Sequence, residues 1–420
     1  MSRSFEKLSG NTSDSGPGLV IGHKSGPSVT KHLYSGPGRI IMKPVRQKNP
    51  HPEDAMNVKK TITAVLILLL VLLSGNQLIP CASFFARGKG ARLFGRGYDF
   101  FTHTGFLVIN TRGVAKQALV YPGDIPASWI SQYGSITFNQ VGQEYPTGGM
   151  NEAGLVIECM WLHETLYPIK DSRPTVMEMQ FMQYILDTCG TVEEIRNAER
   201  KVRIIQNSQP IHFLAADRNG RALIIEFISG YTYLYPVDRN HPAALTNSSY
   251  ADSLTYLKRF RKFGGNEEIR KTLYSVDRFA QLAEAIGDRR PTVEKAFSWL
   301  DLVHVEPGKA GESYTCWNIV YDPVNLKIHF RVFGKPGIHT LSLSDYKLDC
   351  QTGTRYLDLE DIGSKDLKTG FAPLTPEQNT RLVKRTFAIF KKNNFMTSMP
   401  DMYLNILGNY PASFKCADSQ

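Results

Sequence analysis

Cys81 stands where a hydrophobic leader ends, and this position gives an ordinary cysteine a possible chemical role. The stretch from Leu68 to Gly88 reads LLLVLLSGNQLIPCASFFARG, so an apolar run and a few polar residues lead directly into the cysteine. Cleavage before Cys81 would give a chain whose first residue carries both a thiol and a free α-amine. Because an α-amine titrates near about 7.7, one residue would supply the nucleophile and its general base.

A nucleophile of this kind needs a cation, a carboxylate and amide donors around it. The cation lowers the pKa of the thiol, the carboxylate orients the amine, and the donors hold the oxyanion of an acyl-transfer intermediate. The segment LFGRGYDF supplies Arg96 and Asp99, which a hairpin turning through residues 88–90 would return to the side of the cysteine. Two further candidates are Asn247, in ALTNSSY, and Arg278, in LYSVDRF.

The segment before the cysteine has the composition of an export signal. Residues 1–55 carry Gly-Pro turns and no apolar period, so we expect disorder, or an annotation extension upstream of a true start at Met56. Residues 56–80 hold a Lys-Lys pair and an apolar run over 62–73, shorter than the ~20 residues of a membrane span. We predict a signal peptide that is removed, leaving residues 81–420 as a single exported domain, periplasmic or extracellular. The alternative is a cytosolic extension on an anchored protein.

The charge and the cysteines narrow the function classes. Residues 1–80 hold ten Lys and Arg and four Asp and Glu, a net +6; the whole chain is +10, so residues 81–420 carry only +4. Because the basic excess lies mostly in the leader and no basic-aromatic patch stands out, the sequence gives no support to a nucleic-acid partner. The cysteines show no CxxC pair and no zinc spacing, so no metal is expected, and some of the last five could pair. The six are Cys81, Cys159, Cys189, Cys316, Cys350 and Cys416.

Strand-like and helix-like segments alternate without a break after the leader. Residues 105–110 and 135–140 are predicted as strands. Asn219-Gly220 separates two apolar runs, which predicts a hairpin of residues 210–217 and 222–227 with a type I′ turn. Residues 316–321 and 327–332 predict a second hairpin across Asp322-Pro323.

Helices are predicted between these strands. Pro174 is expected to open a helix that Gly190 closes. Thr191 begins a capping box, and Thr375 precedes a Pro at the first turn of another helix. Consecutive strands with amphipathic helices between them favour an α+β layered fold.

At this point the ordered motifs resemble the choloylglycine hydrolase family, whose members include conjugated bile acid hydrolases and penicillin V acylases. These belong to the N-terminal nucleophile (Ntn) hydrolases. The resemblance covers nearly all of residues 81–335. After the cysteine, its landmarks are FGR-x-x-D at 94–99, GGMNEAGLVI at 148–157, HFLAADRNGRALIIEF at 212–227, LTN at 245–247 and DRF at 277–279.

The resemblance implies a four-layer αββα sandwich and a role for each matched residue. The nucleophile would be Cys81, with its own amine as general base. Arg96 would stabilise the thiolate and Asp99 would hold the α-amine. The Asn247 side chain would donate to the oxyanion, and Arg278 would balance charge.

The position of the second oxyanion donor looks like Trp161. The family has Asn or Tyr about ten residues after its MNE motif, where the backbone N–H donates. A tryptophan at this position keeps the backbone N–H as a donor, but its side chain would line the acyl pocket. A second departure is Gly97-Tyr98, where many relatives have an Asn and an aliphatic residue; it changes the turn and not the charged pair.

The implied reaction is hydrolysis of a linear, non-peptide carbon–nitrogen amide of an N-acylated small molecule through a thioester. Trp161 favours an aromatic or fatty acyl group, as in a penicillin V acylase. Conjugated bile acids, N-acyl-homoserine lactones and other N-acyl amino acids are the other candidate substrates. No metal or organic cofactor is implied. Many members are tetramers, so a homotetramer is expected from the resemblance alone.

Each residue also has a plainer interpretation. A lipid anchor at Cys81 would make the chain a non-enzymatic envelope lipoprotein, although Pro80 is unusual both for a lipobox and for an ordinary signal peptidase site. Arg96 and Asp99 would otherwise form a surface salt bridge. Asn247 would be a turn residue or a glycosylation acceptor. The plain alternatives for the last two candidates are a solvated helix residue at Arg278 and a core residue at Trp161.

Overall fold

The computed structural model describes residues 80–417 apart from residues 89, 207–208, 239–240, 289, 311 and 396–398. These residues belong to the unit Gly75–Gln420. The predicted extension at 1–55 and nearly all of the predicted signal segment at 56–80 lie outside the described residues. Within the described part, no helix combines the length and the hydrophobicity needed to cross a membrane.

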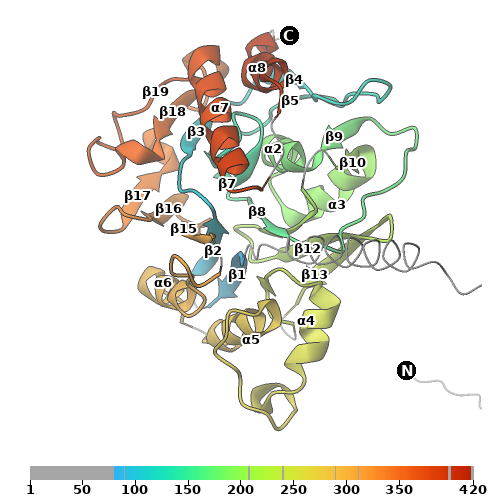
Figure 1. The fold of residues 1–420 in the computed structure, drawn as a ribbon, viewed down its shortest axis with the longest axis vertical. Coiled ribbons are helices and arrows are strands. Elements are labelled where there is room, and N and C mark those ends of the chain that lie inside the picture. Colours follow the sequence, from blue (N-terminus) through green and yellow to red (C-terminus); the bar gives the residue numbers. More distant parts are fainter. Residues whose placement is uncertain are drawn as a thin grey trace, which may run out of the picture. The chain divides into compact units, whose positions relative to one another are not determined.

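Cys81 directly precedes a six-stranded antiparallel sheet (Figure 1). This sheet contains the hairpin that was predicted to turn through residues 88–90. Within this hairpin Ser83 lies opposite Arg96, so the returning strand carries Arg96 back to the start of the first strand. The second predicted hairpin, at 316–321 and 327–332, is also present, as strands β15 and β16. In spatial order the strands are β14 (Ala244–Leu245), β1 (Ala82–Arg87), β2 (Arg92–Phe100), β15 (Tyr314–Asp322), β16 (Lys327–Val332) and β17 (His339–Ser342).

The second sheet is antiparallel, has nine strands and contains both strands predicted singly, as β3 and β6. Its central strands are buried on both faces, because one face meets the first sheet and the other meets helices. In spatial order the strands are β13 (Tyr231–Val237), β12 (Ala222–Ile228), β11 (Ile211–Ala216), β8 (Val156–Trp161), β7 (Pro146–Asn151), β6 (Ser135–Asn139), β3 (Phe106–Asn110), β18 (Arg355–Asp358) and β19 (Ala372–Pro373).

Helices and two small sheets complete the described part. The small sheets are β9 (Thr175–Met177) with β10 (Arg203–Ile205), and β4 (Val114–Gln117) with β5 (Ser128–Ile130) and β20 (Lys415–Cys416). The α-helices are α2 (Glu178–Thr188), α3 (Val192–Lys201), α4 (Tyr250–Leu257), α5 (Ser275–Ala285), α6 (Val293–Asp301), α7 (Pro376–Lys392) and α8 (Asp401–Asn409). The predicted caps at Thr191 and Thr375 are present.

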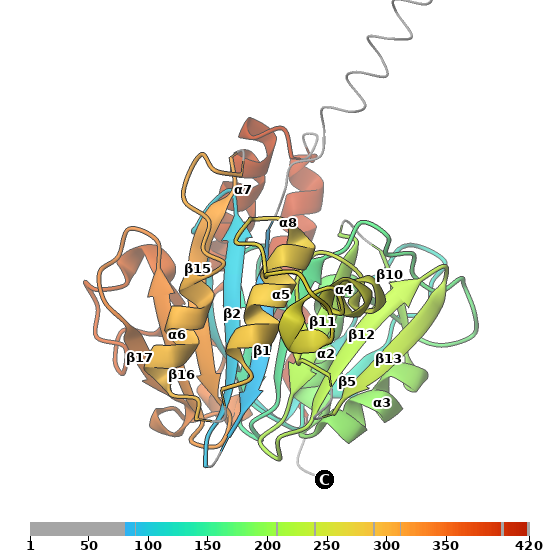
Figure 2. The same ribbon diagram turned by 90° about the horizontal axis from the view of Figure 1, so that it is seen from below.

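Aromatic contacts give the order of the layers. Figure 2 shows α5 and α6 in front of the sheet that holds β1, β2 and β15. The two sheets face each other, and α2 covers the far side of the nine-stranded sheet, so the predicted α+β fold of four layers is confirmed. Three ring pairs with centroids 5.5, 5.6 and 5.5 Å apart join successive layers: Trp299 of α6 with Phe84 of β1, Phe330 of β16 with Phe138 of β6, and Phe213 of β11 with Phe181 of α2.

Two local predictions were wrong. The helix expected to open at Pro174 begins at Glu178, because residues 175–177 form β9 and pair with β10 in parallel. The hairpin of β11 and β12 is present, but its turn is not type I′, since Gly220 has a positive φ of 88° and Asn219 does not. The carboxylate of Asp217 instead accepts hydrogen bonds from the N–H groups of residues 219 and 221, and so organises a longer turn.

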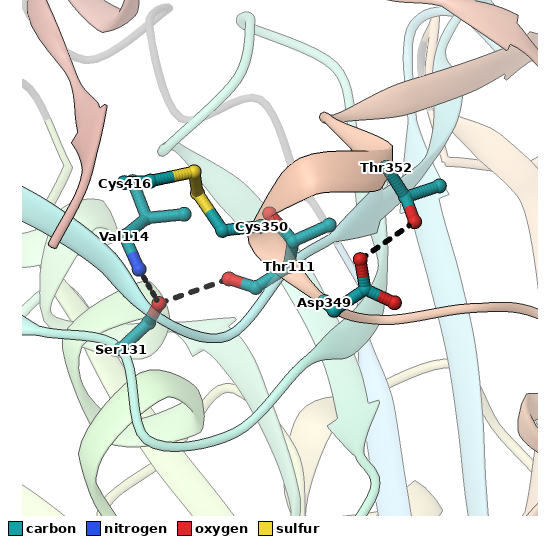
Figure 3. The surroundings of a disulfide bond; sticks show 7 residues. All are labelled: Thr111, Val114, Ser131, Asp349, Cys350, Thr352 and Cys416. Carbon is teal, nitrogen blue, oxygen red and sulfur yellow. Dashed lines mark hydrogen bonds between the residues drawn. A yellow bond between two sulfur atoms is a disulfide. The ribbon is translucent and has the colours of Figure 1, made fainter. Parts of the chain in front are cut away.

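One disulfide ties the C-terminal segment to the body of the fold. Cys350 and Cys416 are bonded, and Figure 3 shows the bond beside the Ser131 hydroxyl. That hydroxyl donates to Thr111 O and accepts from Val114 N–H, each at 2.9 Å. The remaining four cysteines are free and buried.

Candidate active site

The thiol of Cys81 lies directly before β1 and is almost completely enclosed. The residue is 3% exposed, and its Sγ lies 3.3 Å from Nη2 of Arg96 and 3.5 Å from the backbone oxygen of Asp99. Both partners come from β2. The hairpin pairing therefore sets these distances, which a tight turn between two long strands makes possible.

Arg96 is buried and held from three directions. Its Nε donates to Glu158 Oε2 at 3.1 Å and its Nη1 donates to Gly97 O at 3.0 Å. The Tyr98 ring centroid lies 5.2 Å from the guanidinium carbon. Because alternate residues of a strand point to opposite faces, Arg96 points toward the nine-stranded sheet, where Glu158 lies on β8. The plain interpretation of Arg96 as part of a surface pair is wrong.

Asp99 is 1% exposed and lies opposite Thr315 on the neighbouring strand β15. The Thr315 hydroxyl donates to Asp99 Oδ1 at 2.5 Å. Burial raises the pKa of Asp99 to about 6, against the lowering effects of the Thr315 hydrogen bond and the two nearby guanidinium groups. The carboxylate is therefore a buried group whose ionisation falls close to neutral pH.

Arg278 reaches the same place from helix α5. Its Nη1 donates to Pro80 O at 2.7 Å and to Cys81 O at 2.6 Å, and its Nη2 donates to Asn247 Oδ1 at 2.8 Å. The residue is 1% exposed, so it is not the solvated helix residue of the plain interpretation. Burial lowers the pKa of Arg278 to about 10, which leaves it cationic at neutral pH.

Asn247 follows the short strand β14, and its partners fix the orientation of its amide. Its Oδ1 accepts from Arg278, so Nδ2 is the donor, and this donates to Trp161 O at 2.9 Å. The backbone N–H of Asn247 donates to Ser275 Oγ at 2.8 Å. One hydrogen of the amide nitrogen is engaged by Trp161, and the geometry leaves the second as a potential donor.

Trp161 ends strand β8 with its backbone turned toward Asn247. Leu162 N–H donates to Pro210 O on the β11 side, so Trp161 and Ile211 form the non-hydrogen-bonded pair of this ladder. The N–H and C=O of Trp161 therefore both point away from β11, and the C=O meets the Asn247 amide. The indole is partly buried, with its ring centroid 5.8 Å from that of Phe395.

Burial and the positive charge of Arg96 have opposite effects on the pKa of the Cys81 thiol. Burial raises the pKa of the Cys81 thiol, while Arg96 acts in the opposite direction through its charge and its hydrogen bond. The arrangement thus presents a sulfur nucleophile, a guanidinium at its side and an amide donor nearby. These are the components that attack on a carbonyl carbon requires.

The structure brings all six candidate residues together through direct contacts: Cys81, Arg96, Asp99, Trp161, Asn247 and Arg278. Sequence reasoning missed Glu158, Thr315 and Ser275, which contact the candidates. The only available signal was a charged residue within the apolar strand VIECMW. Within the described residues, no group of three or more His, Cys, Asp or Glu side chains is arranged to hold a metal ion.

A sequence model described as "Linear amide C-N hydrolases, choloylglycine hydrolase family" matches residues 81–287, from the cysteine onward. The chain belongs to the choloylglycine hydrolase family. A penicillin V acylase from Pectobacterium atrosepticum is 25% identical over an alignment of 185 residues that covers 40% of this chain and 49% of that protein. The chain therefore spans about half the length of this curated relative.

Solved structures of the choloylglycine hydrolase family resemble the described fold. The penicillin V acylase of Agrobacterium tumefaciens superposes with a TM-score of 0.59 at 25% identity, covering 66% of this chain and 92% of that chain. A variant of the conjugated bile acid hydrolase of Clostridium perfringens gives 0.56 at 15% identity, covering 66% and 97%. The second likeness concerns the fold alone.

Proposed function

We propose that the chain is a cysteine-dependent amidohydrolase that cleaves a linear carbon–nitrogen amide of an N-acylated small molecule. The observation that carries this proposal is the Cys81 sulfur, 3.3 Å from the buried Arg96 guanidinium, at the first residue of the family match. A penicillin V acylase-like activity has the most support, because relatives at 25% identity carry that name.

Removal of residues 1–80 is the first step of the proposed mechanism. In the uncleaved chain the Cys81 nitrogen belongs to the peptide bond with Pro80 and cannot act as a base. Hydrolysis of that bond frees an α-amine, which Asp99 would hold. Arg278 donates hydrogen bonds to Pro80 O and to Cys81 O, the carbonyl oxygens of the two residues that the bond to be cut joins.

Amide cleavage then needs two proton transfers. The α-amine takes the thiol proton as the sulfur bonds to the substrate carbonyl carbon, while Arg96 stabilises the thiolate. The oxyanion accepts hydrogen bonds from Asn247 Nδ2 and the Trp161 N–H. The ammonium returns its proton to the leaving nitrogen as the carbon–nitrogen bond breaks, which leaves a thioester. Water, deprotonated by the amine, hydrolyses the thioester and restores the thiol.

Two further substrate classes remain within the proposal. A conjugated bile acid is one of them, as the family resemblance implies. An N-acyl-homoserine lactone fits an apolar wall such as the Trp161 and Phe395 rings. The non-enzymatic alternative is an envelope lipoprotein anchored through the sulfur of Cys81, and enclosure of that thiol disfavours it.

Export to the periplasm or the extracellular space, after signal removal, is part of the proposal. The disulfide between Cys350 and Cys416 supports it, since such bonds persist in oxidising compartments. A small-molecule amide is the expected partner, membrane association would depend only on the leader, and a homotetramer is proposed from the family resemblance. Cross-linking or light scattering of the mature protein measures the last point.

The decisive experiment compares wild type and Cys81→Ser on a panel of penicillin V, conjugated bile acids and acyl-homoserine lactones. Mass spectrometry of the mature N-terminus accompanies it. We expect a bare Cys81, hydrolysis of at least one amide, and loss of this activity in the variant. A wild-type protein with a free N-terminal Cys81 that hydrolyses nothing would contradict the proposed activity, and a diacylglyceryl group on the sulfur would establish the lipoprotein.

A further inference from the structure

Glu158 is a buried carboxylate to which the proposed mechanism gives no task. It lies on β8 and its side chain is 1% exposed. Its Oε2 accepts from Arg96 Nε at 3.1 Å, and its Oε1 accepts from the Tyr321 hydroxyl at 2.5 Å. On the adjacent strand its partner is Gly148, where a Cβ would lie 2.0 Å from the Glu158 carboxyl carbon. The glycine of the GGMNE motif therefore leaves the room that this carboxylate occupies.

Arg96 stands between two acids that compete for its charge. The same guanidinium donates to the thiol through Nη2 and to Glu158 through Nε. Two buried guanidinium groups thus face three buried acids: Cys81, Glu158 and Asp99. While the α-amine is neutral, ionisation of all three acids would leave an excess negative charge in a site that excludes water, which is costly. A thiolate is therefore easier to form when Glu158 is neutral.

We propose that Glu158 is a positioning residue that aims Arg96 at the Cys81 sulfur and, by its own ionisation, sets how readily the thiol becomes a thiolate. The inference rests on the proposed function, because it concerns the nucleophile of that reaction. An ionised Glu158 shares the charge of Arg96 with the sulfur. A protonated Glu158 leaves that charge to the thiolate, so the two groups titrate as a coupled pair.

The neighbouring groups are consistent with this coupling. Burial raises the pKa of Glu158 to about 7, which places its ionisation in the neutral range. Burial also raises the pKa values of the other acids around the two groups, and these acids therefore stay neutral there. They are Tyr98, Cys159 and Cys316 beside the thiol and Tyr321 beside Glu158. Asp99, Arg278 and the α-amine freed by cleavage are the remaining charged groups near the thiol, and the test variants leave them unchanged.

Glu158→Gln separates charge from geometry, because the amide oxygen can still accept from Arg96. The readout is the rate at which iodoacetamide alkylates Cys81 as a function of pH, followed by mass spectrometry of the peptide that contains this residue. We expect the midpoint of the profile to move to lower pH by about 0.5 to 1 unit. Tyr321→Phe, which removes a hydrogen bond that favours the charged carboxylate, should move it in the same direction by less.

The matched control is Glu193→Gln, which removes the same charge from an exposed position on α3 and should leave the midpoint unchanged. A midpoint for Glu158→Gln that is equal to or above that of wild type would overturn the inference. If Glu158→Gln does not fold, as judged by its thermal transition, Tyr321→Phe decides by the same criterion.

Alkylation needs no amide substrate, so the two proposals fail separately. A shifted midpoint in a protein that hydrolyses no amide would refute the proposed function and keep the coupling. If wild type hydrolyses an amide and the alkylation profiles of wild type and Glu158→Gln superimpose, the coupling between Glu158 and Cys81 is refuted and the proposed function is kept.

Discussion

The described residues include two buried clusters of charged side chains that are similar in composition and differ in what their cations contact. One is the site around Cys81. The other, the Lys116 cluster, consists of Lys116, Glu144 and Asp187, with side chains no more than 3% exposed. Lys116 Nζ lies 2.9 Å from an oxygen of each carboxylate, and Asp187 also accepts from Trp129 Nε1 at 2.8 Å.

The difference between the two regions lies in what each cation contacts. The ammonium of Lys116 is shared by two carboxylates, and the ring of Phe414 lies 5.8 Å from it. Arg96 has one carboxylate and, on its other side, a thiol. A cavity of about 250 Å³ adjoins the Lys116 cluster and not the thiol. Burial, charge and a nearby cavity therefore do not distinguish the candidate active site from the Lys116 cluster. The distinguishing feature is a nucleophile beside a cation.

The largest effect should come from Arg96→Met. This variant leaves Glu158 without its cation and the thiol without its neighbouring charge. We expect amide hydrolysis to fall at least about 10⁴-fold, and the free energy of unfolding to fall by about 3 to 5 kcal/mol. Steady-state kinetics and urea unfolding measure the two losses. Full activity in a folded Arg96→Met protein would show that Arg96, like Lys116, has only a structural role.

Lys116→Met should produce the stability loss without the catalytic loss. Two buried carboxylates would lose their shared cation, which costs about 3 to 5 kcal/mol of stability. At a temperature where the variant is folded, its kcat/KM should equal that of wild type. A fall in kcat/KM in the folded variant would show that the Lys116 cluster contributes to the chemistry.

Opening the disulfide with Cys416→Ser should have the next largest effect. The bond joins residues that lie 66 positions apart in the chain, and its loss should cost about 2 to 4 kcal/mol, with activity retained below the new transition. Calorimetry of wild type and variant, each with and without reductant, measures it. Equal transition temperatures for oxidised wild type and variant would contradict this expectation.

The smallest effect is a pH dependence of kcat/KM that arises at the Cys81 site. Burial raises the pKa of Asp99 to about 6, so below that pH the carboxyl is protonated and cannot hold an ammonium group. We expect kcat/KM to fall about tenfold per pH unit below about pH 6. Circular dichroism at each pH distinguishes this from unfolding. A flat profile from pH 5 to 7 would show that Asp99 is not required in its charged form.

Three hairpins were predicted and all three are present, as β1 with β2, β11 with β12 and β15 with β16. The six candidate residues followed from the motifs of the family resemblance, and the structure places them close together. Apolar runs around turns specify pairing, and the hairpin pairing is what returns Arg96 to Cys81. The predicted helix start at Pro174 was wrong, because the residues after it pair with a distant strand. They form the short strand β9 and not the first turn of a helix. Glu158 was missed since its partners, Arg96 and Tyr321, lie 62 and 163 positions away in the chain.

The bond between Cys350 and Cys416 also determines how the protein would respond to a protease. A single cut anywhere between these two positions would leave both fragments covalently joined, so the nicked protein would keep its mass apart from one added water. It would migrate as two pieces only after reduction. A nicked chain could therefore retain its C-terminal segment beside Lys116 in an oxidising medium and release it in a reducing one.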